Sequence, residues 1–129
     1  MESGAQIDAP RLRELAAQRD ESAAKGCTCA ALQCAAWESI TDDRWPAGID
    51  KVGTLRAPDI DEPTFEEFHP GGTRYDSPQA PIAPEWFPFN RCDVYRCTRC
   101  LGVFLRYTEY GGYYIDHRVR RVDPALIVA

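Results

Sequence analysis

Six cysteines are the residues of this sequence best suited to chemistry, and Cys97 and Cys100 form the most recognisable pattern among them. The pair reads Cys97-Thr98-Arg99-Cys100 and lies between two strand-like runs. A two-residue spacing at a turn lets both sulfurs point at one centre while turn amides donate to the thiolates. Zinc prefers four nitrogen or sulfur ligands in a tetrahedron, so this zinc-knuckle arrangement would supply two of the four.

The other two ligands must come from elsewhere in the chain, and three sources compete. The first is the Cys27 and Cys29 pair, the second is Cys29 with Cys34, and the third recruits His117 from a strand. His69 is expected to be exposed. We take the first source, so the predicted cofactor is Zn²⁺ and the predicted ligands are Cys27, Cys29, Cys97 and Cys100.

Two rival uses of the cysteines remain open. Cys92, Cys97 and Cys100 match the front of a plant-type ferredoxin spacing, but no cysteine follows Cys100 to complete it. A C-x-x-C pair can also be a redox dithiol, although that motif normally sits at a helix N-terminus and strands flank it here. If zinc binds, Cys34 and Cys92 are spare and pack as small hydrophobes.

A closed four-thiolate site has no open position for a substrate, so the predicted metal is structural rather than catalytic. The chain has only two histidines, whereas catalytic zinc commonly uses histidine and a carboxylate. The sequence contains no H-E-x-x-H, G-x-S-x-G or Walker pattern. We therefore favour a binding protein over an enzyme.

These cysteines need a scaffold, and 129 residues with a net charge of −5 and 44% hydrophobic residues suit one globular domain. The expected fold class is α+β, with an N-terminal helix, a small antiparallel sheet and a long proline-rich loop that wraps the domain. Four segments make up this single domain, residues 1–129: a helix (8–26), the cysteine group with tryptophan anchors (27–57), the proline-rich wrapping segment (58–90) and β hairpins (91–122).

The helix over 8–26 is predicted from Pro10 in a first turn, with Asp8 or Ala9 at the cap. Gly26 suits a left-handed residue just after the helix. Further along, Thr41 or Asp42 would begin a short helical turn that ends at Pro46. The expected apolar anchors of these segments are Leu12, Leu15, Ala16, Trp37, Ile40 and Trp45.

Segment 58–90 holds seven of the ten prolines, so little regular structure is expected there. Its aromatic residues indicate an ordered chain rather than a disordered linker. After it, residues 93–97 and 103–107 read as strands around the 98–102 turn. Gly111-Gly112 would turn the chain into a strand over 113–120. The core-facing residues of that strand are Tyr113, Ile115, His117 and Val119.

Charge is unevenly divided along the chain. Residues 91–121 carry seven arginines against three acidic residues, whereas residues 38–85 carry eleven acidic residues against four basic ones. A zinc hairpin rich in arginine and tyrosine, with Arg118 and Arg120 as trial contacts, invites a nucleic-acid hypothesis. The overall negative charge works against it, because the arginines could pair with the chain's own acids. An unidentified protein partner is the favoured alternative.

The start of the chain lacks a basic and apolar leader, and no apolar run is long enough to span a bilayer. The expected location is therefore the cytoplasm, where thiols stay reduced, with no membrane association.

Three runs of the chain resemble small bacterial proteins that carry a zinc-knuckle-like C-x-x-C hairpin and have no assigned function. The runs are residues 34–46, 89–100 and 107–117, and the resemblance would cover most of residues 27–128. It implies a bacterial cytoplasmic setting and no particular activity. Together with the cysteines, it leads us to expect a small zinc-stabilised protein-binding or adaptor module.

Overall fold

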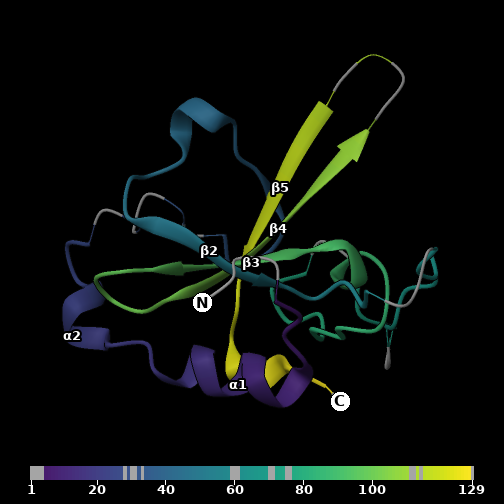
Figure 1. The fold of residues 1–129 in the computed structure, drawn as a ribbon, viewed down its shortest axis with the longest axis horizontal. Coiled ribbons are helices and arrows are strands. Elements are labelled where there is room, and N and C mark those ends of the chain that lie inside the picture. Colours follow the sequence, from purple (N-terminus) through teal and green to yellow (C-terminus); the bar gives the residue numbers. More distant parts are fainter. Residues whose placement is uncertain are drawn as a thin grey trace.

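A short helical region and a five-stranded antiparallel sheet form the protein, as the α+β expectation required (Figure 1). The structure is a computed structural model that describes residues 5–27, 29, 32, 34–58, 62–69, 72–74, 77–110, 113 and 115–128. The sheet order is β1-β5-β4-β3-β2. The helices and strands are α1 (Ala9–Ala17), α2 (Glu21–Ala24), β1 (Glu38–Ser39), β2 (Ile49–Thr54), β3 (Asp93–Cys97), β4 (Val103–Tyr110) and β5 (Ile115–Arg121), with short 3-10 turns η2 (Asp42–Arg44), η4 (Phe89–Arg91) and η5 (Pro124–Leu126).

The predicted single helix over 8–26 is wrong, because the chain forms two helices with a break between them. Asp8 caps α1 through a 3.0 Å hydrogen bond from the Arg11 amide. The carboxylate of Asp20 then accepts from the amides of Ser22 and Ala23, so it starts a new helix instead of continuing the first. Gly26 follows α2 with a φ of +73°, the left-handed conformation expected of it.

The strand predictions around the C-x-x-C turn are confirmed. β3 covers 93–97, and β4 returns antiparallel to it with Asp93 opposite Arg106 and Arg96 opposite Val103. Two strands were missed: β2 pairs with β3, and the two-residue β1 pairs with β5. Neither strand shows a clear alternation of buried and exposed residues. β1 has only two residues, and the register of β2 with β3 shifts between Lys51 and Gly53.

Both faces of the sheet are covered, and successive residues of β3 and β4 serve opposite faces. Val94, Leu105 and Tyr107 belong to the main core, which α1 completes with Leu12, Leu15 and Ala16. On the other face, Phe104 and Val119 join a second cluster that contains five of the cysteines. The sheet is therefore the middle layer between an aliphatic core and a sulfur-rich one.

The β4–β5 hairpin extends beyond the rest of the sheet (Figure 1). The register of β3 ends opposite Arg106 and that of β1 opposite Arg118, so within the described part of the chain the outer parts of β4 and β5 pair only with each other. The expected burial of Tyr113 and Ile115 is consequently wrong, since their exposed fractions are 105% and 64%. The predicted Gly111-Gly112 turn lies outside the described residues.

The proline-rich segment 58–90 contains no strand and only the start of η4 among its described residues. Two side chains fasten it: Asn90 donates to the carbonyl of Thr64 at 2.8 Å, and Arg91 donates to the carbonyl of Pro63 at 2.7 Å. Ring contacts also join Phe68 to Trp86. That this segment wraps the domain stays a prediction, and Pro70, Gly71 and Tyr75 lie outside the described residues.

Candidate metal centre

The four predicted ligands come from two regions that are far apart in sequence. Gly26 turns the chain after α2 and leads directly into Cys27. Cys97 ends β3, and Cys100 lies in the turn before β4. A backbone hydrogen bond joins the regions, since the amide of Asp20 donates to the carbonyl of Cys100 at 2.7 Å. The turn is also tied to the residue before β2, because the Thr98 amide donates to the Gly48 carbonyl at 2.9 Å. The break between α1 and α2 thus holds the N-terminal cysteines against the turn.

The sulfur atoms of Cys27, Cys29, Cys97 and Cys100 all lie within 4.8 Å of one another, and all four residues are buried. The Sγ atoms of Cys27 and Cys97 are 3.6 Å apart, and those of Cys29 and Cys100 are 3.3 Å apart. Four sulfurs placed about 2.3 Å from one zinc ion would be about 3.8 Å from each other. The cluster is therefore close to the size of a tetrahedral four-thiolate site.

The surroundings of the sulfurs lower the pKa of the Cys27 thiol and raise the pKa values of Cys29 and Cys100. A hydrogen bond from the Cys29 amide is the main cause that lowers the pKa of the Cys27 thiol to about 7. Burial raises the pKa of Cys29 and also that of Cys100, although the Gly102 amide acts against it at Cys100. Four clustered thiols cannot all ionise together in such a site, whereas a bound divalent cation would supply the charge that lets them.

Two features beside the sulfurs were not anticipated from the sequence. A Cβ atom built on Gly102 would stand 3.4 Å from the Cys100 sulfur and 3.8 Å from the Arg19 side chain, so a larger residue would press on the cluster. Arg19 and Arg121 line a hollow that reaches Cys29 and Cys100. Their charges suit a four-thiolate zinc centre, which carries a net charge of −2. No sequence spacing relates these residues to the C-x-x-C pair.

The other candidate residues lie apart from the four-sulfur group. Cys34 belongs to the same buried cluster, and burial raises its pKa to about 12. Cys92 lies in the main core, on the other face of the sheet, so the ferredoxin-like spacing is not gathered at one place. His117 interacts with Thr108 at 3.1 Å and approaches Asp42 at 3.8 Å. His69, expected to be exposed, is half-buried beside Glu67.

The two arginines chosen as trial nucleic-acid contacts are engaged within the chain. Arg120 is 1% exposed and donates to the carbonyl of Ala80 at 2.5 Å. Arg118 forms 3.0 Å ion pairs with Glu109 and Asp116. The alternation along β5 placed Arg120 on the solvent face, but segment 78–80 covers that face here. A contact between such distant segments leaves no signal in the local sequence pattern.

Comparison of the chain with protein-family models, curated proteins and solved structures gave no match. None of the helices in the described part of the chain has the length and apolar character that crossing a bilayer requires. The function of the protein is therefore inferred from the geometry of its own side chains.

Proposed function

We propose that the protein binds one zinc ion through Cys27, Cys29, Cys97 and Cys100. The observation that carries this proposal is the buried group of four sulfurs, which has nearly the dimensions of a zinc–thiolate tetrahedron. Two of the sulfurs come from the segment after α2 and two from the end of β3 and the turn that follows it. Thiolates are also the ligands that a borderline-soft cation such as Zn²⁺ accepts, whereas Mg²⁺ and Ca²⁺ prefer oxygen.

The proposed zinc has a structural role. Four protein ligands fill a tetrahedral centre, so no position remains for a water molecule or a substrate. The described histidines do not approach the cluster: His117 faces Thr108 and Asp42, and His69 faces Glu67. The metal would fasten the segment after α2 to the β3–β4 turn, on the side of the sheet opposite the main core.

On this scaffold the protein acts as a protein-binding module. The support comes from the β4–β5 hairpin, whose outer end exposes Tyr110, Tyr113 and Ile115 by 76%, 105% and 64%. Large apolar side chains gathered on an exposed element are characteristic of contact surfaces. Tyrosine in particular supplies a large contact area together with a polar tip.

Metal analysis of the purified chain tests the zinc proposal. We expect close to one zinc per chain and no visible absorption band. The Cys97→Ala variant should lose the metal, while the matched Cys92→Ala variant keeps it because Cys92 lies in the main core. A brown iron-containing protein, or a metal-free protein that remains fully folded, would overturn the proposal.

A photo-reactive amino acid at position 113 tests the binding role in living cells. We expect one dominant cross-linked protein, and we expect the Tyr110→Ser change to remove that product. The same probe at the exposed Glu14 on α1 is the control and should not give that product. If positions 113 and 14 give the same set of products, the hairpin is not a docking element.

Nucleic-acid binding is the second candidate, and one surface favours it. A concave area of the molecule is lined by Arg56, Arg91 and Arg106 together with Phe65 and Tyr110. Arginine and exposed aromatic rings are the side chains that hold single-stranded nucleic acids. Fluorescence anisotropy with a labelled oligonucleotide at low salt tests this candidate, and an unchanged anisotropy at high protein concentration removes it.

A further inference from the structure

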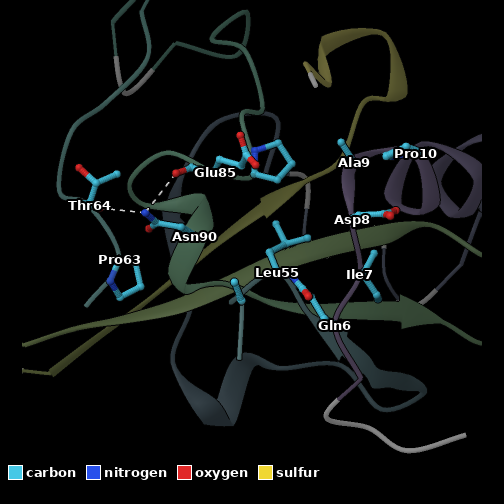
Figure 2. A pocket seen from close by; sticks show the side chains of 12 residues that line it. Gln6, Ile7, Asp8, Ala9, Pro10, Leu55, Pro63, Thr64, Glu85 and Asn90 are labelled. Atoms are coloured by element: carbon cyan, nitrogen blue, oxygen red, sulfur yellow. Dashed lines mark hydrogen bonds between the residues drawn. The ribbon is translucent and has the colours of Figure 1, made fainter. Parts of the chain in front are cut away.

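A second concave region lies away from the cysteine cluster, where the residues before α1 face the proline-rich segment. Figure 2 shows Pro63, Thr64 and Asn90 on one side of it and Ile7, Ala9 and Pro10 on the other. Leu55, which follows β2, lies between these two walls. The cavity measures about 500 Å³. This volume falls within the range of about 300–1,000 Å³ that is usual for small-molecule sites.

The base of this pocket is apolar and firmly placed. Ile7 and Leu55 are 6% and 4% exposed and belong to the main core. The Ile7 amide donates to the Thr54 carbonyl at 2.8 Å, which fixes the N-terminal segment against the end of β2. Three prolines add stiff apolar walls, namely Pro10, Pro63 and Pro84. An apolar group that enters would meet a surface already in position, so little ordering cost would oppose its binding.

Asn90 is buried and holds the opposite wall together. Its side-chain amide nitrogen donates to the carbonyls of Thr64 at 2.8 Å and Glu85 at 3.4 Å (Figure 2). The residue is 6% exposed, and its Oδ1 atom accepts no hydrogen bond from the described residues.

The charged residues that line the pocket have one sign. None of its lining residues is lysine or arginine, while Asp8 and Glu85 both line it. Asp8 points away from the facing wall in Figure 2 and accepts from the Arg11 amide at the start of α1. The Glu85 carboxylate forms no hydrogen bond or ion pair with the described residues and remains available. Further acidic residues lie in the proline-rich segment, namely Glu62, Glu66 and Glu67.

We propose that this pocket binds a small organic cation, an amine with a compact apolar body. The apolar body lies on Ile7 and Leu55 between the proline walls. The ammonium group faces Glu85. A carboxylate or phosphate ligand is disfavoured, because the lining supplies two acidic side chains and no basic one.

Methyl NMR of the zinc-loaded full chain tests the proposal, with cyclohexylammonium as the probe and cyclohexanol and cyclohexanecarboxylate as matched analogues. We expect saturable shifts at the methyl groups of Ile7 and Leu55, in the order amine, then alcohol, then carboxylate. An exposed ion pair of up to about 1 kcal/mol corresponds to a preference of about fivefold for the amine over the alcohol.

Two variants separate direct contact from the general acidic field. Glu85→Gln should bring the amine down to the affinity of the alcohol, whereas Glu62→Gln, which removes a nearby acid outside the lining, should leave the preference intact. Ala57→Leu should weaken both ligands because it fills the cavity. The proposal is overturned if the amine causes no saturable shift, if the carboxylate binds as well, or if Glu85→Gln leaves the preference unchanged.

Discussion

The two sides of the sheet are closed by different chemistry. On one side, α1, the 82–92 stretch and the C-terminal residues bury aliphatic and aromatic side chains against Val94, Val103 and Leu105. On the other side, the buried cluster of described residues contains five cysteines and five larger apolar residues, namely Leu32, Ile40, Ile49, Phe104 and Val119, with Trp45 and Tyr95 partly buried against it. The first side is held by apolar burial, and on our proposal zinc bound to the sulfurs would hold the second side.

The difference shows that a short chain can cover the two faces of one sheet by different means. Burial stabilises in proportion to the apolar area removed from water, and cysteine contributes little of it compared with leucine or phenylalanine. A structural zinc ion contributes an apparent binding free energy of about 10–16 kcal/mol in finger peptides. Even part of that energy is large beside the usual domain stability of about 5–15 kcal/mol.

Removing the metal should have the largest effect and should act on one side only. We expect chelation, or the Cys29→Ser change, to lower the free energy of unfolding by at least about 3 kcal/mol. Denaturant titration measures the loss, and hydrogen exchange locates it in β1 and the residues after α2, while α1 keeps its protection. Equal loss of protection on both sides would contradict the division into two regions.

Truncating the aliphatic core should give the next largest effect and should leave the metal in place. Leu12 is fully buried on α1, so Leu12→Ala should cost about 2–5 kcal/mol. Metal analysis of the folded variant should still give close to one zinc per chain. Loss of zinc from a folded Leu12→Ala protein would show that the two sides are not separable.

Asp20 lies where the two sides meet, and its replacement should have a smaller effect that reaches both. Its carboxylate caps α2 and its amide donates to the Cys100 carbonyl. We expect Asp20→Ala to cost about 1 kcal/mol, because the cap is lost while the backbone bond remains. Transfer of zinc to a competing chelator should become faster in this variant, and Asp8→Ala, which removes the cap of α1, should leave that rate unchanged.

The smallest expected effect concerns Asp116 on the hairpin. Burial acts to raise the pKa of its carboxyl, but hydrogen bonds from Ser39 and Arg118 outweigh burial and hold the pKa below its usual value. A lowered pKa in the folded state stabilises the protein above the unfolded value of about 3.9, and that stabilisation is lost as the pH falls through the folded value.

We therefore expect Asp116→Asn to lower stability at pH 7 by less than about 1 kcal/mol, with the difference vanishing in acid. Thermal unfolding of the two proteins across pH 2–7 measures it. A difference that persists undiminished at the lowest pH would show that the carboxylate charge does not matter there.

Local sequence signals predicted the parts of the molecule that depend on neighbours in the chain. The C-x-x-C turn and the strand at 93–97 follow from spacing and alternation, and Gly26 follows from its position after a helical run. The choice of Cys27 and Cys29 as partners of Cys97 and Cys100 was the first of three open alternatives, the others being Cys29 with Cys34 and a site that uses His117. The sulfur cluster of the structure matches the first alternative.

The remaining features depend on contacts between distant segments. A helical pattern over 8–26 does not reveal that the Asp20 amide would bond to Cys100 and break the helix. The alternation along β5 correctly placed Val119 inward but not Arg120, because the carbonyls of Pro78 and Ala80 cover the opposite face. The same alternation placed residues 113 and 115 inward, but among the described residues no third strand pairs with the end of the hairpin.

X-ray absorption at the zinc edge of the purified full chain tests the central claim most directly. The account predicts one zinc ion per chain with four sulfur neighbours at about 2.3 Å and no nitrogen or oxygen in the first shell. A first shell that contains nitrogen or oxygen, or zinc bound in far less than one equivalent to a folded protein, would contradict it.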